Sequence, residues 1–108
     1  MNSVTTNNNI QSTIAMASLQ HVIDPEIGLN IVDLGLIYQI DFDEINKEIF
    51  VSMTLTTQFC PMGDSIKTGA TRAMQQAFPQ YSIHVELVFD PPWNAGRISE
   101  EGQEFLNR

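Results

Sequence analysis

Three segments in which apolar side chains recur at every second position constrain the fold of this chain most strongly. They span residues 36–42, 49–55 and 83–89. A period of two is typical of a β-strand with one buried face. Because only a short turn at 43–47 separates the first two segments, we expect them to form an antiparallel hairpin.

Two other segments have helical periodicity. In residues 10–23 and again in residues 66–77, apolar side chains recur three and four positions apart. Pro25 and Pro79 are expected to end these helices, since proline disfavours helical backbone in the residue before it. Ser99 is predicted to cap a short helix at the end of the sequence.

The order of these elements predicts the fold class. We expect an α+β domain, helix-strand-strand-helix-strand-helix, with a small mixed three-stranded sheet and helices packed on one face. At 108 residues the chain suits one domain. We place it at residues 10–108 and expect the polar residues 1–9 to form a disordered tail.

Charge and hydropathy exclude several classes of partner. The chain has 13 Asp and Glu against 5 Lys and Arg, a net charge of −8, which disfavours nucleic acid and anionic lipid as partners. No apolar run approaches the roughly 20 residues of a membrane span. The first nine residues lack the features of a secretory signal, so we expect a cytoplasmic protein whose thiol stays reduced.

The single cysteine, Cys60, is the main candidate for chemistry. It precedes Pro61, and proline is favoured at the first position of a helix. A thiol at such a position would have a lowered pKa and would be a better nucleophile and metal ligand. Two alternatives remain: Cys60 is a small buried hydrophobe, or the helix begins later, with Asp64 or Ser65 as its cap.

Residues elsewhere could assist this thiol. Thr56 approaches it along the second strand and could donate a hydrogen bond, although β-propensity alone also explains a threonine there. Asp24 lies on a loop that must return to the sheet, where its carboxylate could reach the thiol. It could equally cap the turn that follows it.

The segment Asp90-Pro91-Pro92-Trp93 places the only tryptophan on a stiff loop directly after a strand. Pro92 and Trp93 are therefore candidates for binding a partner protein, because tryptophan is enriched at binding hot spots. Alternatively, Trp93 covers the core. The chain has no glycine-rich phosphate loop, H-E-x-x-H motif or C-x-x-C pair, so we assign no catalytic residue and expect no enzyme activity.

Four motifs follow one another over nearly the whole chain beyond the tail. They are Asp24-Pro25-Glu26, residues 31–38, residues 53–56 leading to Cys60-Pro61, and Asp90-Pro91-Pro92-Trp93 followed by Arg97 to Glu101. Together they resemble the iron-sulfur cluster assembly domain of the SufT/PaaD type. The chain ends without the cysteine-rich tail of the PaaD branch, which favours the SufT-like branch.

The resemblance implies a role in maturing iron-sulfur proteins, either in late cluster delivery or in bringing client proteins to the assembly machinery. It also implies that Cys60 is the functional residue and metal ligand and that Asp24 lies near it. The expected partners are apo iron-sulfur clients and the assembly machinery. Two other functions stay open: an adaptor with a structural cysteine, or a cysteine-dependent thiol enzyme.

Cluster chemistry limits what one chain can do. Iron-sulfur clusters normally need four thiolates, and this chain supplies one. A symmetric homodimer would bring two Cys60 thiols together, with a small thiol, Asp24 or a client's cysteines filling the remaining positions. We therefore expect any iron-sulfur cluster to be transient and shared between subunits.

Overall fold

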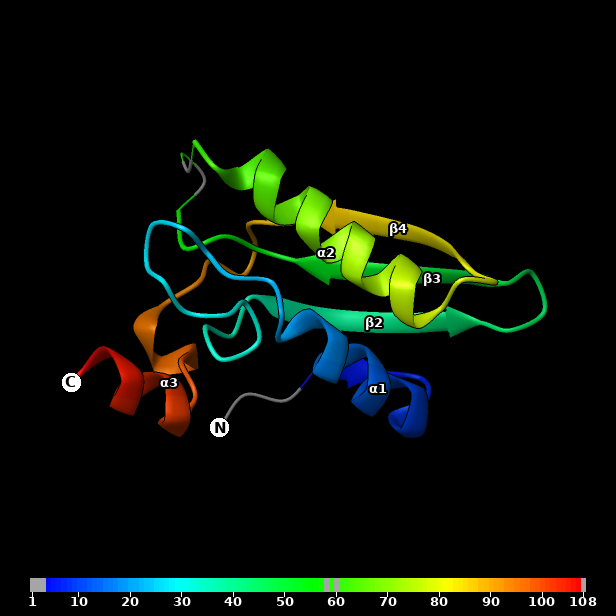
Figure 1. Cartoon of the computed structure of the whole chain (residues 1–108), viewed down its shortest axis with the longest axis horizontal. Coiled ribbons are helices and arrows are strands. Elements are labelled where there is room, and N and C mark those ends of the chain that lie inside the picture. Colours follow the sequence, from blue (N-terminus) through cyan, green and yellow to red (C-terminus); the bar gives the residue numbers. More distant parts are fainter. Residues whose placement is uncertain (1–3, 58, 60, 108) are drawn as a thin grey trace.

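The computed structural model describes residues 4–57, 59 and 61–107. Its elements, in chain order, are β1 (Thr5–Thr6), α1 (Asn9–Leu19), β2 (Ile37–Asp43), β3 (Glu48–Met53), α2 (Gly63–Ala77), β4 (Ser82–Leu87), a 3-10 turn (Ala95–Arg97) and α3 (Glu100–Leu106) (Figure 1). The predicted α+β class is confirmed.

The sheet has the strand order β1-β2-β3-β4. Strands β2 and β3 form the predicted antiparallel hairpin, in which Asp43 pairs with Glu48 at the turn. Strand β4 lies parallel to β3, with Met53 opposite Leu87, so α2 connects two parallel neighbours. The sheet is therefore mixed, as predicted.

The predicted strand number and the predicted tail were both wrong in part. Thr5 and Thr6 pair in parallel with Gln39 and Ile40, which makes β1 a fourth strand within the segment expected to be disordered. The first helix begins at Asn9, because the side chain of Asn8 caps it by accepting a hydrogen bond from the backbone N–H of Gln11 at 3.0 Å.

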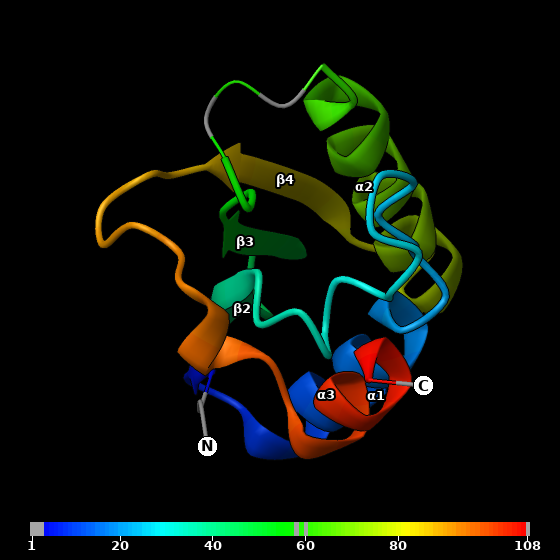
Figure 2. The same ribbon diagram turned by 90° about the vertical axis from the view of Figure 1, so that its left-hand side faces the viewer.

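Helices α1 and α2 pack on one face of the sheet, as predicted (Figure 2). The core lies between them and the sheet. It includes apolar side chains at every second position of β3, together with residues of both helices: Ile49, Val51, Met53, Leu19, Ile66, Ala70 and Met74. Each large side chain buried here contributes roughly 1.5–3 kcal/mol.

The opposite face of the sheet carries the alternate residues of β3 and β4. Glu48, Phe50, His84 and Glu86 lie there, and Phe50 stacks on the His84 ring at a centroid distance of 4.9 Å. In Figure 2 neither α1 nor α2 lies on this side. We call it the open face.

Candidate functional site

Cys60 lies outside the described residues, as does Gln58, but the loop that carries Cys60 has well-defined ends. It leaves β3 through Thr54 and Leu55, which are both buried, and enters α2 at the buried Gly63. Between these ends, the described neighbours of Cys60 are exposed, and the Phe59 side chain is 82% exposed. The sequence next to the cysteine therefore faces solvent.

The start of α2 differs from the prediction. Pro61 was expected at the first helical position, with Cys60 at the helix cap, whereas the helix begins at Gly63 and its capping residue is Met62. Met62 has no side-chain oxygen to bind the first free N–H groups. Cys60 is thus three residues before the helix, and the argument for a thiolate at the helix terminus weakens accordingly.

Asp24 is 1% exposed. Its Oδ1 accepts a hydrogen bond from the backbone N–H of Glu26 at 2.9 Å, and its backbone carbonyl accepts one from Gly28 N–H at 2.7 Å. An isolated bridge between Ile23 and Asn30 closes this loop. The structure therefore shows the turn-capping contact that was the alternative for Asp24, while a role for this carboxylate beside Cys60 stays a prediction.

The threonines before Cys60 differ in accessibility. Thr54 is fully buried, and its backbone N–H donates to the carbonyl of Leu36 at 2.8 Å, which extends the β2–β3 pairing beyond the strands. Thr56, the predicted site residue, is half-buried, and Thr57 is exposed and accepts a hydrogen bond from Phe59 N–H at 3.2 Å. Thr56 and Thr57 are therefore more accessible than Thr54, and a role for Thr56 beside Cys60 stays a prediction.

A surface groove of about 440 Å³ lies between the loop that carries Asp24 and helix α2. Pro25, next to Asp24, lines one side of it, and Met62, next to the Cys60 loop, lines the other. His21 and Arg72 also line it. Sequence reasoning missed this groove, because its residues come from two separate segments and only Pro25 belongs to a motif found in the sequence.

The predicted partner-binding residues Pro92 and Trp93 lie apart from this groove. Pro92 is exposed, whereas Trp93 is half-buried against the core, and its indole N–H donates to the carbonyl of Leu34 at 2.6 Å. Nearby, the Tyr38 hydroxyl donates to the carbonyl of Pro91 at 2.7 Å. Trp93 thus has the core-covering position that was its alternative, and partner binding by either residue stays a prediction.

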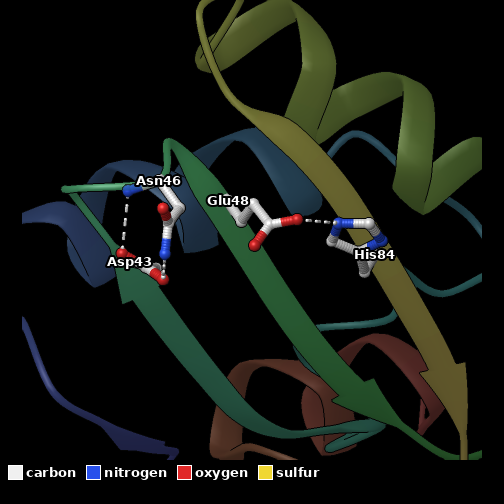
Figure 3. A network of polar contacts seen from close by, with 4 residues as sticks. All are labelled: Asp43, Asn46, Glu48 and His84. Carbon is white, nitrogen blue, oxygen red and sulfur yellow. Dashed lines mark hydrogen bonds and ion pairs between the residues drawn. The ribbon is translucent and has the colours of Figure 1, made fainter.

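The described part of the chain offers few side chains that could bind a metal ion together. It contains no group of three or more His, Cys, Asp or Glu side chains that could hold a metal ion. His21 lines the groove, and His84 lies on the open face with its Nε2 3.2 Å from Glu48 Oε1 (Figure 3).

No helix in the described ranges has the length and apolar character needed to cross a membrane.

Comparison with known proteins decides the family. The model of the family described as "Iron-sulfur cluster assembly protein" matches residues 14–86, which include both segments that flank the groove. This chain belongs to the iron-sulfur cluster assembly protein family. The resemblance found in the motifs is thereby confirmed.

Relatives of this iron-sulfur cluster assembly protein cover most of its length. It is 36% identical over 84 residues to the Fe-S protein maturation auxiliary factor YitW of Bacillus subtilis, covering 78% of this chain and 81% of the relative. It is 37% identical over 78 residues to the Fe-S protein maturation auxiliary factor SufT of Staphylococcus aureus, covering 72% and 88%.

Solved structures share its fold. A domain of unknown function from Bacillus anthracis matches with a TM-score of 0.83 and 33% identity, covering 93% of this chain and 98% of that one. A conserved hypothetical protein from Thermotoga maritima matches with a TM-score of 0.75 and 36% identity, covering 100% of both chains.

Proposed function

We propose that this chain is an iron-sulfur protein maturation factor that acts in late cluster delivery or client targeting, with Cys60 as its metal ligand. Family membership and the names of the relatives from Bacillus subtilis and Staphylococcus aureus support the general role. The observation that carries the proposed mechanism is the exposure of Phe59 and Pro61 on either side of Cys60, between the buried Leu55 and Gly63. A ligand on such a loop is accessible to a second protein.

In this proposal the cluster is cargo. One cysteine supplies one of the four thiolates that a cluster normally needs, and the described residues add no three-residue ligand group. The other ligands must therefore come from outside the chain, as a client's cysteines, a small thiol or a second copy. Incomplete ligation suits transfer, because a cluster held by few bonds can leave by ligand exchange.

The groove beside the loop gives the client a place to bind. Its lining combines apolar Val22, Ile66 and Met62 with Arg72, the latter a cation on an otherwise acidic protein. A client segment in this groove would lie between the Asp24 loop and the approach to Cys60. Asp24 then acts by fixing the shape of the 24–29 loop, through its hydrogen bond with Glu26.

Anaerobic reconstitution with iron and sulfide tests this proposal. We expect visible absorption and stoichiometric sulfide on the wild-type chain in the presence of a small thiol, and loss of both in Cys60→Ser. A matched control, Thr57→Ser, keeps the thiol while changing the same loop and should retain the cluster. Equal metal and sulfide content in wild type and Cys60→Ser would count against Cys60 as the ligand.

A second candidate, an adaptor that recruits clients without holding a cluster, is favoured by one observation: Phe59, a large aromatic residue, is 82% exposed beside Cys60. Exposed aromatic side chains commonly anchor protein contacts. Client pull-down separates the two functions. Binding and maturation that survive Cys60→Ala but fail in Phe59→Ala would favour the adaptor.

A further inference from the structure

Strand β4 is an outer strand of the sheet, since its only neighbour in the strand order is β3. It pairs with β3 over six consecutive positions without a register shift. Its sequence, Ser82–Leu87, contains no proline, glycine or lysine. Natural proteins often use proline, lysine or bulges to prevent outer strands from pairing with other chains. Strand β4 has none of these three.

Backbone hydrogen bonds show which groups of β4 remain available. The N–H of Ser82 donates to the carbonyl of Lys47 at 2.8 Å, and the N–H of Val88 donates to that of Met53 at 2.8 Å. Both even-numbered residues thus face β3. Because alternate residues of a strand direct their backbone groups to opposite sides, the N–H and C=O groups of Ile83, Val85 and Leu87 point away from the sheet.

The side chains of β4 divide in the same alternation. Ile83, Val85 and Leu87 are half-buried beside the core, on the helix-covered face. His84 and Glu86 are exposed on the open face, and His84 Nε2 contacts Glu48 Oε1 at 3.2 Å (Figure 3). A strand added to this edge would cover apolar side chains on one face and meet a histidine and a carboxylate on the other.

We propose that β4 pairs antiparallel with β4 of a second copy, with the two-fold axis at Val85. In this register each Val85 exchanges both backbone hydrogen bonds with Val85 of the other copy, and Ile83 lies opposite Leu87. His84 then lies opposite Glu86 in a non-hydrogen-bonded pair, the arrangement in which cross-strand side chains are closest. The two four-stranded sheets become one continuous sheet.

The sequence of β4 favours this register over the registers with the two-fold axis at an adjacent residue. An axis at His84 would place two histidines opposite each other, and an axis at Glu86 would place two carboxylates opposite each other, which is unfavourable. An axis at Ile83 would shorten the paired region. Only the axis at Val85 both uses the whole strand and pairs each His84 with a Glu86.

The same complementarity favours a second copy as the occupant of this edge. A strand from another protein would need an outward-facing pattern that matches Ile83, Val85 and Leu87 as well as the histidine and carboxylate positions, and β4 itself has that pattern. The net charge of −8 on each chain opposes association at long range. That repulsion is screened over about 8 Å at physiological salt, whereas the His84–Glu86 contacts are local.

The dimer has a consequence for the Cys60 loop. Met53, where that loop leaves the sheet, pairs with Leu87 at one end of β4. Antiparallel pairing about Val85 separates the two Leu87 residues by four strand positions, roughly 13 Å along the strand. The two loops thus leave the combined sheet at opposite ends of the shared edge.

Amide exchange in the intact chain tests the interface without any substitution. Backbone N–H groups of Ile83, Val85 and Leu87 should become protected from exchange as protein concentration rises, at about 0.15 M salt. Those of His84 and Glu86 should be protected at every concentration, because they already bind β3. The proposal is overturned if the chain stays monomeric in sedimentation at hundreds of micromolar and amide exchange at Val85 does not change with concentration. In that case the edge would bind a different kind of partner.

Substitutions at Val85 give a second test. Val85→Pro removes an N–H that β3 does not use and should abolish dimerisation, while Val85→Ala keeps the N–H and should weaken it less. Dispersed amide spectra and an unchanged β3–β4 ladder report that each variant folds. A dimer that survives Val85→Pro uses another face and contradicts the proposal.

Charge exchange tests the register. His84→Glu places two carboxylates opposite each other twice in the dimer and should raise the dissociation constant by about tenfold. The double variant His84→Glu/Glu86→Arg places a carboxylate opposite a guanidinium and should recover most of that loss. If the double variant dimerises no better than His84→Glu, the register is wrong. Cys60→Ser leaves β4 unchanged, so this interface and the proposed function can fail separately.

Discussion

The hydroxyl of Ser99 donates a hydrogen bond of 2.7 Å to the Asp33 carboxylate, which joins the start of α3 to the loop before β2. The backbone N–H of Ser99 also donates to the Asp33 carbonyl at 2.8 Å, and Asn30 donates to the same carboxylate at 2.7 Å. Asp33 therefore has a structural role. These contacts hold together the segments around Asp33 and Ser99, which lie 66 positions apart in the sequence.

Replacing Ser99 should destabilise the domain. Ser99 also caps α3 by accepting a hydrogen bond from Gly102 N–H at 3.0 Å. Ser99→Ala removes the cap and leaves Asp33 with one donor fewer, so we expect a loss of about 1–2 kcal/mol in the free energy of unfolding. Urea denaturation measures it, with the exposed Ser82→Ala as control. Equal midpoints for the two variants would contradict this role.

Gly35 should tolerate no side chain. Its φ is +76°, and a Cβ there would lie 2.7 Å from the Cβ of Arg97. We expect Gly35→Ala to lower the free energy of unfolding by about 3 kcal/mol, from backbone strain and displacement of Arg97.

Gly28 is the matched control for this substitution. Its φ is +83°, but nothing lies within 4 Å of its Cβ position. Gly28→Ala should therefore cost only the backbone strain, about 1 kcal/mol. A smaller loss for Gly35→Ala than for Gly28→Ala in denaturant unfolding would show that the approach of Arg97 is not a constraint.

The roles of Trp93 and Pro92 can be distinguished by the stability of one variant of each. Trp93→Phe removes the donor to the carbonyl of the buried Leu34, and we expect a loss of about 2 kcal/mol in unfolding free energy. Pro92→Ala alters an exposed side chain and should leave stability within about 0.5 kcal/mol. If Pro92→Ala impairs client pull-down at unchanged stability, the predicted partner contact of Pro92 is supported. If Trp93→Phe is as stable as the wild type, the core-covering role of Trp93 is refuted.

Asp43 should contribute to the acid sensitivity of the fold. Hydrogen bonds from the backbone N–H of Asn46 and then from its side-chain amide, at 3.0 and 2.9 Å, hold the pKa of Asp43 below its ordinary value of 3.8 (Figure 3). A carboxyl whose pKa falls on folding stabilises the fold above 3.8, and this contribution is lost as the pH drops through the lower, folded value.

Asp43→Asn tests this linkage. The variant keeps an acceptor for Asn46 but has no proton to gain, so its stability should decline less steeply than that of the wild type as the pH falls below about 4. Unfolding followed by circular dichroism at a series of pH values measures the slope. Parallel profiles for the two proteins would exclude Asp43 as a contributor.

The strands and α2 could be predicted because their apolar residues are periodic and buried. Ile49, Val51 and Met53 alternate in sequence and face the core in the structure. Strand β1 could not be predicted in this way, since its two threonines are held by backbone pairing with Gln39 and Ile40, 34 positions further along the chain. Such pairing depends on the completed sheet and leaves no local pattern.

The candidate site was only partly predictable for the same reason. Motif resemblance made Cys60 and Asp24 the candidates, but the groove between Pro25 and Met62 arises from the packing of α2 against a loop distant in sequence. The start of α2 was predicted too early, because proline is favoured at the first helical position and Pro61 was placed there, whereas the helix begins at Gly63. The sequence alone did not decide between partner binding and core covering for Trp93. Its hydrogen bond to the carbonyl of Leu34 joins residues 59 positions apart and is visible only in the folded structure.

Client maturation measures the central claim most directly. A purified apo iron-sulfur enzyme is incubated anaerobically with an assembly scaffold and either the wild-type chain or Cys60→Ser, and the rate at which enzyme activity appears is recorded. We expect the wild-type chain to accelerate activation and Cys60→Ser, folded by its amide spectrum, to give only the rate of the scaffold alone. Equal acceleration by both chains would contradict a role for the Cys60 thiol in cluster delivery.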